Sequence, residues 1–182
     1  VYSFIIHIFH CPISLCLMDN YIKFFTATIL NWQTLLKLDQ CKQIIVDSMK
    51  FLVEDKRVWI YGFVIMPNHL YILWRLQEGI TQEKVQRDFL KFAAQKIKFD
   101  LLQKHPLVLP YFKSTQSDRE YHFWERRPYS STIHNRQVME QKLYYIHHNP
   151  VVEKWKLVEK PEDYYYSSAR YYLLNEASFD FI

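Results

Sequence analysis

The sequence predicts an α+β fold: a ferredoxin-like, split βαβ domain with an antiparallel central sheet and a further helix towards the C-terminus. Three observations lead to this class. Apolar runs rich in aromatic and β-branched residues alternate with longer stretches of helical periodicity. These elements follow in the order strand, helix, strand, strand, helix, and then a last strand or ribbon. The 182 residues are 49% hydrophobic with only two glycines, which suits one domain with a core of its own.

The first half of the chain supplies four elements. KFFTATIL, residues 23–30, has the content of a strand on a half-buried surface. An amphipathic helix is expected from Asp39, in an N-cap position, to Lys56. Two apolar runs follow, residues 58–66 and 70–76. Pro67-Asn68-His69 between them predicts two strands that meet at a tight connection.

The second half begins with a long helix, for which Thr81 is an acceptable N-cap and which is expected to run to about Gln103. Residues 105–120 contain two prolines and little periodicity, which predicts an irregular excursion. A third helix is expected over residues 136–148, and Asn149-Pro150 would end it. A tyrosine-rich segment follows. The predicted core stripe of the long helix comprises Val85, Phe89, Phe92, Ile97 and Leu101.

Lysine and arginine side chains gather on one face of the long helix. Lys84, Arg87, Lys91 and Lys98 recur at steps of three, four and seven residues, so they share a face about 100° wide or less. This pattern fits a solvated surface and a phosphate-binding surface equally well. The net charge of +4 and the pI near 8.8 permit binding to a polyanion without requiring it.

Residues 1–17 form an apolar run without a basic n-region or a small-residue cleavage site. We expect Met18 to be the biological start, residues 1–17 to be an upstream extension, and residues 18–182 to form a single domain; a weak membrane anchor is the alternative. The three cysteines include no CxxC pair, which disfavours a disulfide framework or a thiolate zinc site. Reduced thiols suit the cytoplasm, and no membrane partner is expected.

Four segments together carry a specific resemblance. They are VIMPNHLY (residues 64–71), RDFLKF (residues 87–92), FWERR (residues 123–127) and YIHHNP (residues 145–150). In this order, on a strand, a helix, a ribbon and a helix end, they resemble the REP-associated tyrosine transposases of the HUH single-strand endonuclease superfamily. The match covers residues 21–174. Each motif alone has an ordinary structural explanation, but four in order do not.

The resemblance implies that Tyr145 is the nucleophile. A phenol that attacks a phosphodiester becomes joined to the 5′ phosphate and leaves a free 3′ hydroxyl, which stores the bond energy for rejoining. Neutral phenol is a weak nucleophile near neutral pH, so a divalent cation, Mg²⁺ or Mn²⁺, is expected to assist. Tyr144 is a possible substitute, but it faces away from the side that Tyr145 shares with Asn149.

His69 matches the first histidine of the family's metal-binding pair. On a strand the residue two positions further on points to the same face, and that residue is Tyr71, where the family has its second histidine. A neutral phenol is a poor ligand beside an imidazole, which puts metal affinity in doubt. Asn149 lies one helical turn after Tyr145, where the family places an amide near the metal, and an amide carbonyl is an acceptable ligand for Mg²⁺.

The implied partner is single-stranded or hairpin DNA, bound by a monomer or a homodimer. The DNA contacts are expected from the basic helix face and the ribbon, with Trp124 or Tyr121 available for base stacking. The predicted contact residues are Lys84, Arg87, Lys91, Trp124, Arg126 and Arg127.

Three functions remain open at this point. The first is an active single-strand endonuclease and ligase that tolerates Tyr71. The second is a degenerate transposase that binds DNA hairpins without cutting them. The third is a ferredoxin-like structural domain unrelated to DNA, which a basic helix face covered by residues 105–120 would favour.

Overall fold

A computed structural model describes residues 21–182, and the expectations for residues 1–17 lie outside the described residues. Four strands form one sheet in the order β2-β3-β1-β4: β1 (Ile22–Thr28), β2 (Val58–Ile65), β3 (His69–Leu76) and β4 (Tyr129–Ile133). Every neighbouring pair is antiparallel, and β3 lies between β1 and β2, which the chain joins through a helix. The predicted α+β class with an antiparallel central sheet is confirmed.

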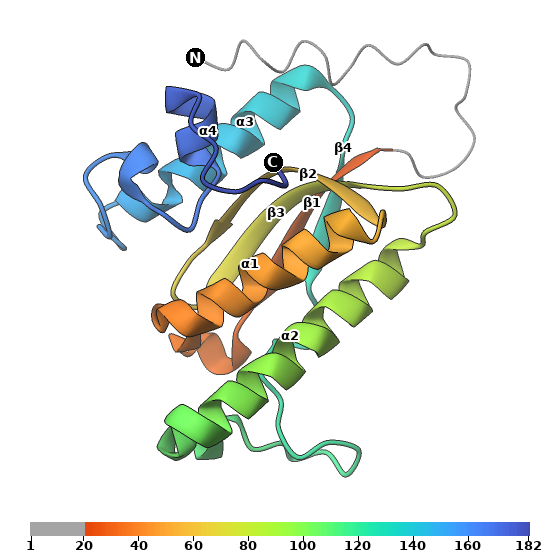
Figure 1. The fold of residues 1–182 in the computed structure, drawn as a ribbon, viewed down its shortest axis with the longest axis vertical. Helices are drawn as coiled ribbons and strands as arrows, with labels where there is room; N and C mark the ends of the chain where they lie inside the picture. The colour runs from red at the N-terminus through yellow and green to blue at the C-terminus, as the bar shows by residue number, and fades with distance from the viewer. Residues whose placement is uncertain (1–20) are drawn as a thin grey trace.

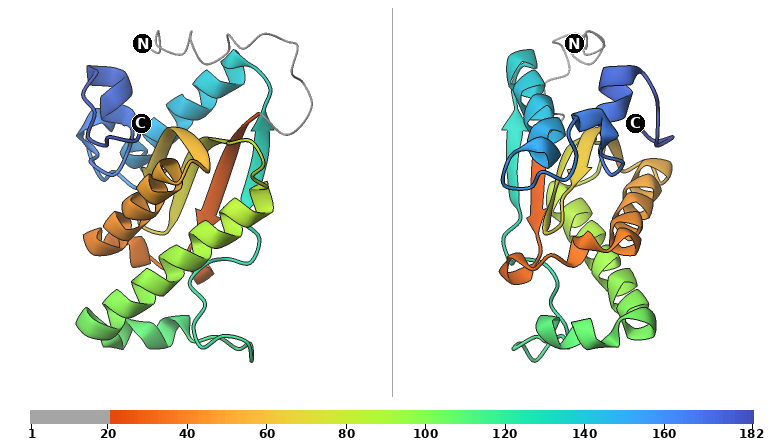
Figure 2. Two further views of the ribbon diagram at one scale, coloured as in Figure 1. Left: turned by 45° about the vertical axis from the view of Figure 1, so that its right-hand side comes forward. Right: turned by 90° about the vertical axis from the view of Figure 1, so that its left-hand side faces the viewer.

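Helices cover both faces of the sheet. On one face lie α1 (Asp39–Glu54) and α2 (Gln82–Lys104), and on the other lies α3 (Arg136–His148), as Figures 1 and 2 show. The short α4 (Ala169–Leu174) follows at the β2 edge of the sheet. The core divides accordingly into a larger cluster under α1 and α2 and a smaller one under α3. The smaller cluster is the one that borders the candidate site.

The core stripe of α2 differs from the predicted one at a single position. The buried residues follow at steps of four: Val85, Phe89, Ala93, Ile97 and Leu101. Phe92 is 39% exposed and stacks on Phe51 of α1, with ring centroids 6.1 Å apart. Phe92 precedes Ala93 and so points about 100° away from the buried stripe. The prediction of Phe92 as a core residue was wrong, because it favoured the larger apolar side chain over the four-residue spacing.

The ribbon of residues 123–125 runs beside the end of β1. Leu30 N donates to Phe123 O at 2.8 Å, and Glu125 N donates to Thr28 O at 2.8 Å. Residues 166–168 lie along the outer edge of β2 in the same way, through Ile65 N to Tyr166 O at 2.9 Å and Ser168 N to Phe63 O at 3.0 Å. These contacts pair backbone groups that a sheet edge would otherwise leave open. Within residues 21–182, no helix is long and apolar enough to span a membrane.

Candidate functional site

The beginning of β3 places two candidate residues on the face of the sheet that α3 covers. His69 and Tyr71 alternate with the buried Leu70 and Ile72, which face α1 and α2. The rings of His69 and Tyr71 lie 4.9 Å apart between centroids. The Tyr71 ring also stacks on Phe24 of β1, with centroids 5.4 Å apart. The predicted placement of residues 69 and 71 on one face is confirmed.

Asn68 sets the tautomer of His69. Nδ1 of His69 lies 2.6 Å from Oδ1 of Asn68, and since an amide oxygen can only accept, Nδ1 carries the proton and donates it. The lone pair is then on Nε2, which is buried and has no hydrogen-bond partner within residues 21–182. Burial, followed by the charge of Lys154, lowers the pKa of His69 to about 4. The imidazole is therefore neutral near pH 7, with a free acceptor nitrogen.

The last turn of α3 brings the remaining two residues to the same place. Tyr145 is 46% exposed, whereas Asn149, one turn later, is buried. Pro150 follows, and α3 changes there into a single 3₁₀ turn, so the predicted helix end is confirmed. Tyr144 faces away and stacks on His148 with ring centroids 3.8 Å apart, which leaves Tyr145 as the tyrosine of this helix at the site.

The two phenols at positions 71 and 145 are hydrogen-bonded to each other, with their hydroxyl oxygens 2.9 Å apart. Burial and the neighbouring hydroxyl of Tyr145 raise the pKa of Tyr71, and a contact with the Asn149 side chain offsets this in part. Tyr71 is therefore a neutral phenol at any physiological pH. It can orient the hydroxyl of Tyr145, but it does not supply an anionic oxygen.

A divalent cation would find two suitable atoms here. Nε2 of His69 and Oδ1 of Asn149 are both buried acceptors that lack a hydrogen-bond partner in the described chain. Both residues adjoin Tyr71. No group of three His, Cys, Asp or Glu side chains that could hold a metal occurs among residues 21–182. The donor set thus fits a weakly held ion, with imidazole and amide as ligands and Tyr71 adding a poor one.

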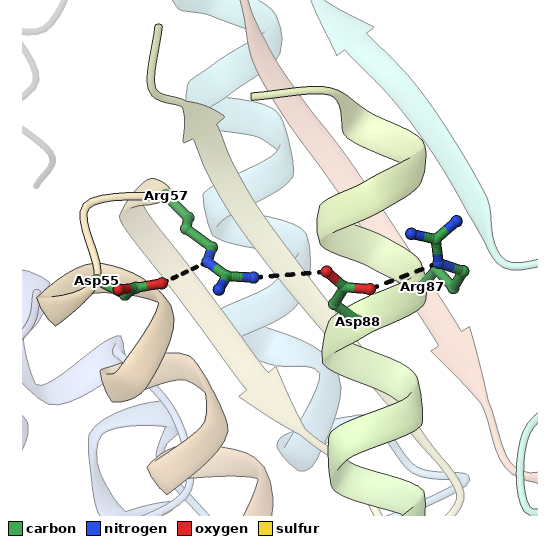
Figure 3. Close-up of polar contacts among 4 residues, drawn as sticks. All are labelled: Asp55, Arg57, Arg87 and Asp88. Atoms are coloured by element: carbon green, nitrogen blue, oxygen red, sulfur yellow. Dashed lines mark hydrogen bonds and ion pairs between the residues drawn. The ribbon is translucent and has the colours of Figure 1, made fainter. Parts of the chain in front are cut away.

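Four of the six predicted DNA-contact residues line one groove. Arg87, Lys91, Trp124 and Arg126 line a groove of about 830 Å³ between α2 and residues 118–128, whereas Lys84 and Arg127 are exposed outside it. Figure 3 shows that Arg87 approaches Asp88, at 3.4 Å, while Arg57 bridges Asp88 to Asp55 from the other side. Lys98 lies at the far end of the groove and pairs with Glu120 at 2.8 Å. The excursion therefore covers only the Lys98 end of the basic face.

The stacking role expected of Trp124 does not match its position. Its side chain is 6% exposed, and its indole N–H donates to the backbone carbonyl of Leu90 at 3.1 Å. Trp124 thus forms the inner wall of the groove and anchors the ribbon to α2. Tyr121 is half-buried, with the ammonium of Lys98 5.0 Å from its ring centroid.

Two tryptophans that the sequence analysis did not single out flank His69. The ring of Trp155 lies 5.8 Å and that of Trp32 6.4 Å from the imidazole. Nothing in their sequence neighbourhood marks them, because each reaches His69 from a connection after β1 or after α3. Asn68 was within reach of sequence reasoning, since it directly precedes His69 in the VIMPNHLY motif.

Comparisons with known proteins bear on the family resemblance. No family model matches the chain. A curated protein of Haemophilus influenzae named "Putative REP-associated tyrosine transposase" is 28% identical over 160 residues, which cover 83% of this chain and 85% of that protein. A solved REP-associated tyrosine transposase bound to a REP hairpin has a similar fold, with a TM-score of 0.61 and 20% identity, covering 84% of this chain and 79% of the other. The resemblance inferred from the four motifs is confirmed.

Proposed function

We propose that this chain, a relative in sequence and fold of the REP-associated tyrosine transposases, binds hairpin-forming DNA and cuts a single strand through Tyr145. One observation carries the proposal: a half-exposed tyrosine hydroxyl lies 2.9 Å from the hydroxyl of Tyr71, beside a neutral histidine with a free lone pair. The hairpin bound in the related structure supports the choice of partner.

The chemistry follows from the exposed hydroxyl. The phenolic oxygen of Tyr145 attacks the phosphorus of a phosphodiester, forms a bond to the 5′ phosphate and releases a 3′ hydroxyl. The reverse attack by a 3′ hydroxyl rejoins a strand and frees the tyrosine. Tyr71 orients the attacking hydroxyl through their shared hydrogen bond. The phenol loses its proton as the bond to phosphorus forms, and the leaving 3′ oxygen takes up one proton, so the step balances.

His69 and Asn149 would hold a divalent ion, Mg²⁺ or Mn²⁺, through Nε2 and Oδ1. Such an ion would polarise the scissile phosphate and stabilise the leaving oxygen. The tautomer set by Asn68 keeps Nε2 free for this role without any rearrangement. Because residues 21–182 bring only these two strong donors to Tyr71, we expect the affinity for the ion to be low.

A second function has an observation of its own. Tyr71 occupies the place of a metal-binding histidine, remains a neutral phenol and engages the hydroxyl of Tyr145. A protein with these properties could bind DNA hairpins and yet be unable to cut them. The groove beside α2 would then be its DNA-binding surface.

One experiment separates the two functions. The full chain is mixed with labelled single-stranded hairpin oligonucleotides and Mn²⁺ or Mg²⁺, and a covalent protein–DNA band is sought on a denaturing gel. Tyr145→Phe and Tyr71→His are run in parallel. Tyr144→Phe is the matched control, because Tyr144 is a neighbouring exposed tyrosine on the same helix that stacks on His148.

We expect a band with the wild-type chain and with Tyr144→Phe, and none with Tyr145→Phe. A band that forms only with Tyr71→His would favour the second function. It would mean that the wild-type chain binds DNA without cutting it and that one substitution restores cleavage. Binding without a band in any variant would also favour the second function. If no hairpin binds at all, both proposals fail.

A further inference from the structure

Trp32 is a large apolar side chain held in the open. It lies in the connection after β1, and its side chain is 60% exposed. Its backbone is left-handed, with φ of 57°, and so is that of Asn31 before it, with φ of 53°. Two consecutive left-handed residues, one of them bulky, are rare and unfavourable. Such strain persists only where surrounding contacts impose it, and it gathers at functional sites.

Three hydrogen bonds impose this conformation. Trp32 N donates to Ile29 O at 2.9 Å, and Asn31 N donates to Oε1 of Glu125 in the ribbon at 2.8 Å. The side-chain amide of Asn68 donates to the carbonyl of Trp32 at 3.1 Å. The backbone that carries the exposed ring is therefore held by the ribbon on one side and by Asn68, just before β3, on the other.

The same Asn68 joins Trp32 to the candidate site. Its amide nitrogen holds the backbone of Trp32, while its amide oxygen accepts the proton of His69 Nδ1. The rings then follow one another from Trp32 to His69, Tyr71 and Tyr145, with centroid separations of 6.4, 4.9 and 5.3 Å. The backbone of an exposed ring is thus tied, through Asn68, to the strand that carries His69 and Tyr71.

Cations complete the surroundings of this row of rings. The ammonium of Lys154 lies 5.5 Å from the ring of Trp155, which is next to His69. That of Lys142 lies 4.5 Å from the ring of Phe24, which stacks on Tyr71. Exposed rings for bases with nearby cations for phosphates are the combination that binds single-stranded nucleic acid.

We propose that Trp32 is the stacking platform for an unpaired base of the DNA strand that enters the Tyr145 site. This inference rests on the proposed function and adds to it the residue that positions the strand. Trp32 would thus take the base-stacking role that was expected of Trp124, which is buried. Because every base has a π face, the platform selects for an unpaired nucleotide and not for a particular base.

The test measures the affinity of the full chain for a labelled hairpin oligonucleotide with a thymidine tail, without divalent metal, so that no cleavage intervenes. Trp32→Ala is expected to weaken binding about 5- to 150-fold, the range typical of one lost base–aromatic stack. Trp32→Phe keeps a ring and should retain most of the affinity. Trp59→Ala is the matched control, since Trp59 is also exposed but lies under Arg75 at the opposite end of β2.

A second series removes one base at a time from the tail. One abasic position should weaken the wild type by a similar factor but leave Trp32→Ala unchanged, because the stack is already lost there. Equal affinities of Trp32→Ala and the wild type would overturn the stacking role while the proposed function stands. The stacking role would also be overturned if Trp32→Ala and an abasic position each weakened binding, and their effects added at every position of the tail. If the wild type binds no hairpin, the proposed function fails first, and this platform with it.

Discussion

His147 is a histidine next to the site that serves the fold. Its side chain projects from the last turn of α3 and is fully buried, and Nε2 lies 2.8 Å from the hydroxyl of Ser168, which accepts a hydrogen bond from the backbone N–H of Phe63. This link joins α3 to β2 through the C-terminal segment. Burial, followed by the charge of His148, lowers the pKa of His147 to about 3.

Acid is therefore expected to destabilise the protein well above the pH at which carboxylates titrate. The unfolded chain takes up a proton on this imidazole below about pH 6.5, whereas the folded chain does so only near pH 3, so stability falls as pH drops between these values. At pH 5 the loss from His147 is roughly 2 kcal/mol relative to pH 8. Urea denaturation at both pH values measures it. His147→Gln can still bond to Ser168 and should reduce the loss; an unchanged loss would contradict the assignment.

The packing of α3 on the sheet depends on one glycine. Gly62 lies at an irregularity of β2, and a Cβ built there would stand 2.6 Å from Cδ2 of Leu143 in α3. The close approach of this helix brings Tyr145 and Asn149 to His69 and Tyr71. An element contact thus sets the geometry of the site.

Gly62→Ala should consequently force the Leu143 side chain out of its place between α3 and β2. We expect the free energy of unfolding to fall by about 1–3 kcal/mol, the usual cost of overpacking a core. Chemical denaturation measures this loss. Adding Leu143→Val shortens the side chain that meets the new methyl group and should recover part of it. If the double variant is no more stable than Gly62→Ala alone, the clash is not the cause.

The C-terminal residues close the molecule on the face of α1 and β2. Phe179 packs against Phe63 of β2 with ring centroids 5.2 Å apart, and Phe181 lies 6.1 Å from the same ring. Asp180 between them pairs with Lys50 of α1 at 2.6 Å. The end of the chain therefore belongs to the larger core, far along the sequence from the elements that it covers.

Phe179→Ala is expected to lower the free energy of unfolding by about 3 kcal/mol, because it removes a buried ring from a close-packed core. Asp180→Asn, the matched control, breaks an exposed ion pair and should change stability little. Thermal or urea unfolding compares the two. Equal effects of the two substitutions would mean that the tail contributes through charge and not through packing.

Local sequence patterns determined much of the fold and part of the site. The strand and helix assignments and the shared face of residues 69 and 71 follow from periodicities of two and 3.6 residues, which are local properties of the backbone. The antiparallel sheet was predicted from the order of these elements and from the tight connection at residues 67–69. The four-residue spacing of Tyr145 and Asn149 predicted their common helical face in the same way. The order of four motifs then predicted the family resemblance.

The tertiary structure alone decided which side chains meet. The hydrogen bond between Tyr71 and Tyr145, the approach of Trp32 to His69 and the burial of Trp124 join residues that the sequence separates by tens of positions. Periodicity specifies the direction in which a side chain leaves its own backbone. Only the packing of helices and strands against one another specifies which residues that side chain contacts.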